Sequence, residues 1–261
     1  MNTVLDVLLK RKSIRAYEQK EIPAEIKAQI LQACLRAPTA GNMMLYSIVD
    51  VTEQALKDRL AQTCDNQPFI ARAPMVWLFL ADYQRWQDYF VACGVEEICE
   101  RENQAMRKPA EGDLLLACCD ALIAAQSAVV AAESLGIGSC YIGDIMEQYE
   151  THRELFNLPQ YTFPICLICF GYPTEQQLNR EQPKRFDEKF IVFENRYQRL
   201  ETSEFDEMFR QRHEQMFNGR ASIEGSINVG QAMYRRKFSA EFSLEMTRSV
   251  RAMLKDWESE R

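Results

Sequence analysis

The sequence of 261 residues contains very little histidine. His152 and His213 are the only two, and both stand among charged residues of predicted helices. A zinc site of the His/Cys type needs histidine beside its other ligands, and a Ser-His-Asp triad needs it beside the nucleophile. We therefore predict neither a metal site nor a catalytic triad.

An excess of positive charge is also missing. The chain has 31 Lys and Arg residues against 38 Asp and Glu residues, a balance that argues against nonspecific binding to nucleic acid or anionic lipid. The N-terminus has a short apolar stretch followed by basic residues, which reverses the order found in a signal peptide. Nine cysteines without a regular disulfide framework are typical of a reducing compartment. We expect a cytoplasmic protein.

One apolar segment, residues 114–135, is long enough to cross a membrane. It carries Asp120 and Glu133, and a charge near the middle of a bilayer costs about 2.5–3.5 kcal/mol. We therefore predict a long buried helix that begins near Asp113. A helix that is apolar on most of its circumference needs neighbours on nearly every side, and a partner subunit would supply them.

Hydrophobic patterning predicts alternating strands and helices before residue 200 and helices after it. Strands are expected at 46–51, 74–81, 140–142, 162–170 and 189–193. Helices are expected near the N-terminus and at 23–36, 53–62, 147–157, 203–217 and 239–258. A more polar helical excursion is expected at 84–112. We divide the chain into a core over residues 1–200 and a C-terminal helical extension over residues 201–261.

Three polar clusters stand apart from this pattern. They are the basic run RKSIR at 11–15, the small-residue loop APTAGN at 37–42 and the glycine-rich stretch GIGSCYIGD at 136–144. Arginine offers paired donors to a phosphate, and small residues let a ligand approach the backbone. Taken singly, the first is typical of a solvated surface, and the second fits an ordinary turn and a ligand-binding loop equally well. The third does not match the G-x-G-x-x-G spacing of dinucleotide-binding folds.

Two further motifs have simpler interpretations. Cys166 and Cys169 form a C-x-x-C within an apolar strand, without a second pair or a nearby histidine, which favours buried core thiols over a redox or metal site. The run at 235–237 and Arg220 are basic and are candidates for binding a phosphate group, but a solvated helix start is the commoner role for such residues.

In order and spacing, the three clusters resemble the nitroreductase family over nearly the whole chain. The segments that carry the resemblance are RKSIRAY at 11–17, APTAGN at 37–42, ESLGIGSCYIGDI at 133–145, FGYP at 170–173 and PKRFDEKFIVFENRY at 183–197. Gln67, the phrase WLFLAD at 77–82 and the extended C-terminal tail resemble the NADPH-preferring, oxygen-insensitive branch of nitroreductases and flavin reductases. The resemblance implies an α+β fold with a mixed, mostly antiparallel sheet flanked by helices. It also implies an intertwined homodimer whose C-terminal helical extension packs on the partner subunit.

The resemblance implies an FMN-dependent enzyme that oxidises NADPH or NADH. Hydride would pass to flavin N5 and then to a nitroaromatic, a quinone or a free flavin in a ping-pong reaction, so no catalytic side chain is expected. One alternative is a relative that uses reduced flavin for dehalogenation or flavin destruction. Another is a flavin-binding regulatory or electron-carrier protein, which steady NADPH consumption with an acceptor would rule out.

The resemblance also implies which residues hold the FMN phosphate and border the chain next to it. The residues that match phosphate-binding positions, or lie among them, are Arg11, Lys12, Ser13, Lys184 and Arg185. The residues expected to border the ribityl chain and phosphate from the partner subunit are Thr39, Ala40, Gly41 and Asn42. Relatives often have Lys-Pro-Arg where this chain has Gln182-Pro183-Lys184-Arg185, so Arg185 carries more weight than Lys184.

The flavin ring is expected to meet a third group of residues. Arg15 matches a cation beside the N1–C2=O2 edge, where reduction places negative charge that a guanidinium stabilises. Gln67 is expected to hydrogen-bond the ring. The stretch expected to face N5 and O4 with its backbone amides is Tyr141, Ile142, Gly143 and Asp144. Relatives often have a second glycine in place of Asp144, a departure that would alter the surroundings of N5.

Overall fold

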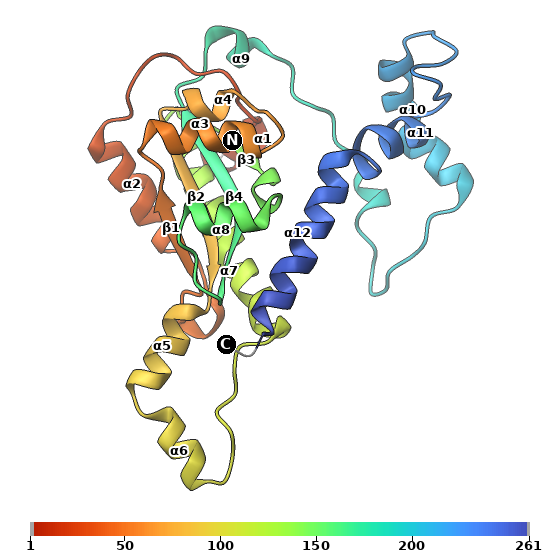
Figure 1. Ribbon diagram of the computed structural model, residues 1–261. Helices are drawn as coiled ribbons and strands as arrows, with labels where there is room; N and C mark the ends of the chain where they lie inside the picture. The colour runs from red at the N-terminus through yellow and green to blue at the C-terminus, as the bar shows by residue number, and fades with distance from the viewer. Residues whose placement is uncertain (1–2, 260–261) are drawn as a thin grey trace. The chain divides into compact units, whose positions relative to one another are not determined.

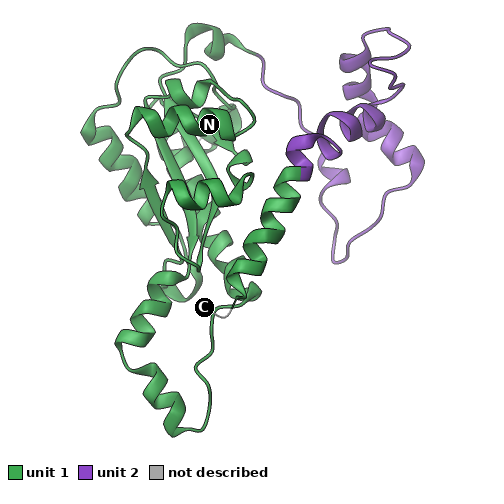
Figure 2. Cartoon of the chain, viewed as in Figure 1, with its two compact units in different colours: residues 1–180, 245–261 green, residues 181–244 purple. Residues whose placement is uncertain are grey.

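A computed structural model describes residues 3–259 of the chain, which form two compact units (Figure 2). Unit 1 comprises Met1–Arg180 and Glu245–Arg261, and unit 2 comprises the intervening Glu181–Leu244. The functional division into residues 1–200 and 201–261 stays a prediction.

Unit 1 is built on a four-stranded antiparallel sheet with the strand order β1-β2-β4-β3 (Figure 1). The strands are β1 Tyr46–Asp50, β2 Met75–Asp82, β3 Gly138–Ile142 and β4 Thr162–Gly171. All three pairings between them are antiparallel. Among the described residues, parallel pairing is confined to an isolated bridge between Ser13 and Ser139. The prediction of a mostly antiparallel sheet flanked by helices is confirmed.

Helices cover both faces of the sheet because its central strands are apolar on both sides. Every residue of β2 is buried, and successive side chains of a strand point to opposite faces. Trp77 and Phe79 pack with α2 Ala24–Leu35 and α7 Glu111–Ser134 on one face. Leu78 and Leu80 pack with α3 Gln54–Thr63 and α4 Phe69–Arg72 on the other.

The long helix α7 buries a stripe of small side chains against the sheet. The stripe includes Ala117, Ala121, Ala124, Ala128 and Ala132, each fully buried, at the spacing of one helix face. The Asp113 carboxylate accepts from Ala110 N at 2.9 Å at the start of the helix. In residues 3–259, α7 is the one helix long and apolar enough to cross a membrane by length and composition, and its alanine stripe forms part of the core instead.

The remaining elements of unit 1 surround this sandwich. They are α1 Thr3–Lys10, η1 Ala40–Asn42, α5 Gln84–Ala92, α6 Val95–Arg101, η2 Asp144–Met146, α8 Tyr149–Leu155 and α9 Glu175–Asn179. The predicted helical excursion corresponds to α5 and α6, followed by extended chain. The chain between Arg101 and Glu111 is not helical, and the excursion as a separate part of the domain stays a prediction.

Unit 2 contains short helices and no strand among its described residues. Its elements are η3 Glu188–Phe190, α10 Thr202–Phe217, α11 Val229–Met233 and the π-helical turn η4 Tyr234–Phe238, and α12 Glu241–Trp257 begins in unit 2 and continues into unit 1. The predicted strand at 189–193 is wrong. The Asp187 side chain accepts from Lys189 N at 3.1 Å and starts a helical turn, while Ile191 and Val192 are exposed. An apolar run becomes a strand only where another strand pairs with it.

Candidate functional site

The first predicted cluster, residues 11–15, is fastened to the start of β3. Ile14 N donates to Ser139 O at 2.8 Å. The approach is close enough to require a glycine, because a Cβ on Gly138 would lie 2.5 Å from Ile14 Cγ1. Gly171, on the neighbouring strand, leaves room for the Tyr17 ring in the same way. The backbone of the basic run is thus held in place by the core.

Three guanidinium groups act on Cys140, the third residue of β3. Burial raises the pKa of the Cys140 thiol, and the positive charges of Arg15, Arg11 and Arg180 oppose that rise. Arg180 was not predicted as a site residue. It lies in an exposed loop 167 residues after Ser13, whose backbone carbonyl accepts a hydrogen bond from Arg180 Nη2.

Lys12 adds a fourth positive charge and uses backbone partners. Its Nζ donates to Leu178 O at 2.7 Å and also to Arg180 O. Because Lys12 and Arg180 bond to neutral carbonyls, their charges are not cancelled by these partners. Glu133 is the nearby acid. Burial raises its pKa to about 6, although Arg11 and Ser139 favour its charged form. The cluster as a whole therefore suits an anion such as a phosphate.

A second group of predicted residues meets at the other end of β3. The strand carries the chain about 13 Å from Ser139 to Gly143. There the backbone N–H groups of Gly143 and Asp144 have no hydrogen-bond partner within residues 3–259. Gln67 Nε2 donates to Asp144 Oδ2 at 2.7 Å. The structure therefore brings Gln67 to Asp144, 77 positions later in the sequence, and so to the end of β3.

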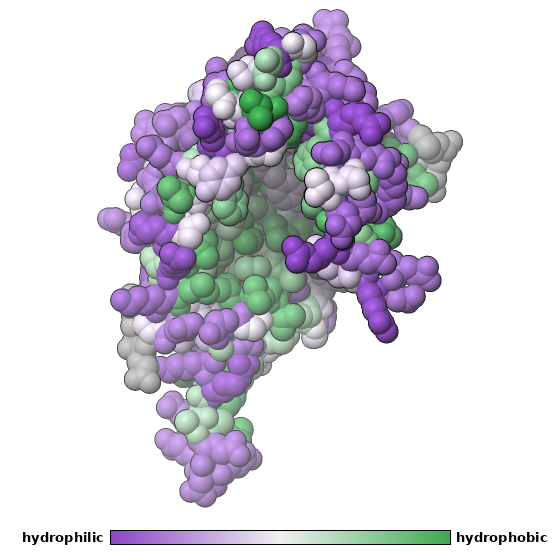
Figure 3. All heavy atoms as spheres, turned by 90° about the vertical axis from the view of Figure 1, so that its right-hand side faces the viewer, coloured by the Kyte–Doolittle hydropathy of each residue, from purple (hydrophilic) through white to green (hydrophobic). Residues whose placement is uncertain are grey.

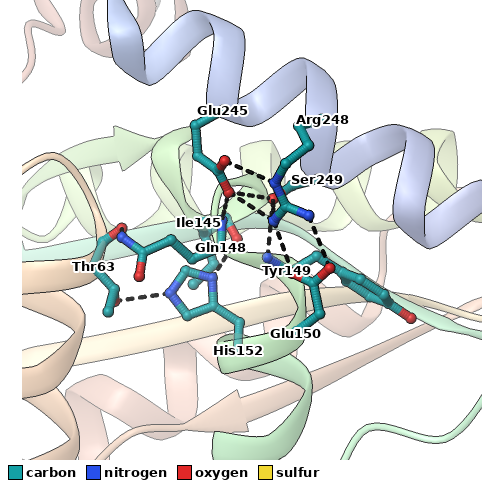
Figure 4. Close-up of polar contacts among 9 residues, drawn as sticks. All are labelled: Thr63, Ile145, Gln148, Tyr149, Glu150, His152, Glu245, Arg248 and Ser249. Atoms are coloured by element: carbon teal, nitrogen blue, oxygen red, sulfur yellow. Dashed lines mark hydrogen bonds and ion pairs between the residues drawn. The ribbon is translucent and has the colours of Figure 1, made fainter.

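The segment after Asp144 is fixed by contacts with two other elements (Figure 4). Glu245 Oε1 and Ser249 Oγ, both on α12, accept from Gln148 N at 3.1 Å and from Tyr149 N at 3.0 Å. The fully buried His152 places Nδ1 2.8 Å from Ile145 O and Nε2 2.8 Å from a threonine hydroxyl of α3. Burial lowers the pKa of this imidazole, in keeping with a structural role.

The small-residue loop is shaped by a carboxylate that was not predicted as a site residue. Ala40 N and Leu45 N donate to the two oxygens of Asp120, at 2.9 and 3.1 Å. Asp120 lies on α7 and is 2% exposed. Gly41 and Asn42 adopt left-handed backbone conformations, with φ of 55° and 59°. The sequence signal for this role is a single acidic residue within an apolar stretch of helix. A buried carboxylate needs hydrogen-bond donors around it, and here the loop supplies them.

This loop and the basic cluster lie at opposite ends of the same sheet. The loop leads into Tyr46, which pairs with Ala81 near the end of β2. Ser139 lies beside the basic cluster and pairs with Phe170 of β4. On its other side, Phe170 pairs with Met75 at the start of β2. Met75 and Ala81 are six residues apart along β2, which corresponds to a separation of about 20 Å between the two ends. A single subunit therefore does not bring Thr39–Asn42 to the basic cluster.

The other predicted residues have different outcomes. Lys184 and Arg185 belong to unit 2, and their part in the site stays a prediction. Cys166 and Cys169 are both buried, in different core clusters. Burial raises the pKa of Cys166 to about 12, and it also raises the pKa of Cys169 well above its ordinary value. They are core thiols and are not a redox pair.

The chemistry of these donors fits FMN. A cluster of cations can hold the phosphate, and about 13 Å away along β3 two unpaired amides and an amide side chain offer hydrogen bonds to a polar ring edge. Arg15 belongs to this cluster, and its positive charge acts on Cys140 of β3. Such an arrangement stabilises an electron-rich ring without any side chain taking part in bond making.

Comparisons with known proteins point the same way. Residues 8–172 match the family model described as the nitroreductase family. The chain is 28% identical over 201 residues to an oxygen-insensitive NADPH nitroreductase of Salmonella typhimurium, covering 77% of each chain. It is 29% identical over 198 residues to an FMN reductase (NADPH) of Bacillus subtilis, covering 76% of this chain and 75% of the relative. A solved NADPH:FMN oxidoreductase of Vibrio harveyi complexed with NAD+ matches with a TM-score of 0.78 and 25% identity, over 97% of this chain and 98% of that one.

Proposed function

This chain belongs to the nitroreductase family, and we propose that it is an FMN-dependent NAD(P)H oxidoreductase that reduces nitroaromatics, quinones or free flavins. Bound FMN would supply the redox chemistry, accepting hydride from the nicotinamide and passing electrons to the acceptor. The names of the relatives favour NADPH as the donor. The observation that carries the proposal is the cation cluster joined by one strand to the unpaired amides of Gly143 and Asp144.

The residues of this chain bind and orient the cofactor. Arg11, Ser13 and Arg180 would hold the phosphate, assisted by Lys12. Arg15 would stabilise the negative charge that reduction places on the N1–C2=O2 edge of the ring. Gln67 and the amides of residues 143 and 144 contact the polar edge. Protons come from water, so no acidic side chain is required.

The protein works as a homodimer in the cytoplasm. The loop at 39–42 is about 20 Å from the basic cluster of its own subunit, so a second subunit supplies it to each site. The outer face of α7 offers the apolar surface for such an interface. Its exposed large side chains are Leu115, Leu116, Leu122 and Ile123. Figure 3 shows hydrophobic residues gathered on one face of the molecule with hydrophilic residues around them, a distribution typical of interaction surfaces.

The first experiment is the absorption spectrum of the purified protein, followed by stopped-flow reduction with NADPH and with NADH. We expect a bound-flavin spectrum that bleaches on mixing with NADPH. A colourless protein that takes up no added FMN would disprove the proposal.

Turnover then separates an enzyme from a carrier. With menadione or nitrofurazone as acceptor, an enzyme consumes NADPH steadily at 340 nm. A single burst equal to the amount of flavin would instead favour an electron-carrier protein.

A further inference from the structure

The side-chain amide of Gln67 has a defined orientation. Its Nε2 donates to Cys64 O at 3.0 Å and to Asp144 Oδ2 at 2.7 Å. A backbone carbonyl can only accept, so the nitrogen and not the oxygen must face Cys64. An amide nitrogen has two hydrogens, and these two bonds use both. The remaining polar atom of the Gln67 side chain is its oxygen. This oxygen accepts hydrogen bonds, and it is the atom of the side chain that is left for a ligand.

A second buried carboxyl lies close to Asp144. Glu147, three residues later, is 4% exposed, and its Oε1 has no hydrogen-bond partner within residues 3–259. Burial raises the pKa of Glu147 to about 8, and the charge of Asp144 and a hydrogen bond to it add to the rise, as do Asp65 and Glu245. Glu147 is therefore a buried acid close to Asp144 that holds its proton more tightly than an ordinary glutamate does.

We propose that Asp144 is a positioning residue that turns the Gln67 oxygen toward the flavin, so that Gln67 recognises a ring N–H. This inference rests on the proposed function. The oxidised isoalloxazine ring has one N–H donor, at N3, and its other polar edge atoms are acceptors that would repel the Gln67 oxygen. The Asp144–Gln67 pair therefore selects the N3 edge.

The test compares two ligands that differ at N3. Apoprotein is titrated with FMN and with N3-methyl-FMN, following the quenching of flavin fluorescence. We expect wild type to prefer FMN by about tenfold or more, the value of one lost hydrogen bond with its acceptor left unpaired. In Asp144→Ala the preference falls by about fivefold, because one of the two acceptors that hold the Gln67 nitrogen is lost and Cys64 O alone remains. Asp144→Asn retains the preference, since its Oδ1 still accepts from Gln67 Nε2.

An NMR signature separates orientation from a general loss of structure. With 15N-labelled FMN, the N3–H proton is expected downfield in wild type and Asp144→Asn, and near its free position in Asp144→Ala. Gln67→Met removes the acceptor and leaves Asp144 in place, so it should lose the same preference even if Asp144→Ala does not fold. Asp58→Ala is the matched control, because it breaks an exposed Gln–Asp hydrogen bond of the same 2.7 Å length at Gln54.

The outcomes distinguish this inference from the proposed function. If FMN binds to every variant with the same ratio to N3-methyl-FMN, and the N3–H signal does not move, the positioning role is overturned while the flavin site stands. If wild type binds neither flavin, the proposed function itself fails.

Discussion

Glu147 makes the stability of the protein depend on pH. Burial, then the neighbouring carboxylates, raises its pKa to about 8. Between about pH 4.5 and pH 8 the folded state holds a proton that the unfolded chain has released, so stability falls as pH rises through that window. Glu147→Gln removes this titration. We expect the variant to gain about 1–3 kcal/mol over wild type at pH 8.5 and little at pH 4.5, measured by urea unfolding.

The control for this prediction is Glu150→Gln. Arg248 lowers the pKa of the exposed Glu150, so the control should show no gain at high pH. Parallel pH profiles for Glu147→Gln and wild type would contradict the prediction.

Arg180 is expected to contribute to phosphate binding and not to ring binding. It joins Arg11 and Arg15 around Cys140, and a hydrogen bond to a charged group contributes about 1.5–3 kcal/mol. Arg180→Ala should therefore weaken FMN binding by about tenfold or more, while riboflavin, which lacks the phosphate, binds as before. Fluorescence titration with both flavins measures this, with Arg59→Ala on α3 as control. An equal loss for both flavins would show that Arg180 acts on the fold instead.

At the scale of elements, α7 shapes the loop that precedes β1. Two backbone N–H groups of this loop, at Ala40 and Leu45, depend on the buried carboxylate of Asp120. Asp120→Ala leaves both donors without a partner, which costs about 1–3 kcal/mol for each buried group. We expect a loss of about 2–4 kcal/mol in the free energy of unfolding. Urea unfolding at neutral pH measures it.

Ser127→Ala is a matched control on the same helix, because the exposed hydroxyl of Ser127 bonds only to Ile123 O within α7. A loss in Asp120→Ala no larger than that of the control would mean that water replaces the carboxylate.

At the scale of the whole molecule, the outer face of α7 is expected to be the subunit interface. Leu122 and Ile123 are each 41% exposed on a helix whose opposite side is fully buried. Placing glutamate at both positions puts charge into an apolar interface, which unpaired charges destabilise strongly. We expect a folded monomer by light scattering that has lost FMN, because each site would lack the loop of the partner. Gln62→Glu, on α3 at the other face of the sheet, should remain dimeric and yellow. A dimeric, yellow double variant would place the interface elsewhere.

Sequence alone determined the parts that depend on local pattern. β2 and β4 were predicted because apolar runs of their length suit strands buried on both faces, and the family was predicted from motifs in a fixed order. Only the tertiary structure decided which residues meet. Arg180 reaches Ser13 across 167 positions and Asp120 caps a loop about 80 positions away, and no periodicity encodes such pairs. The run at 189–193 has strand composition but no strand partner, because pairing is a property of the fold and not of the segment.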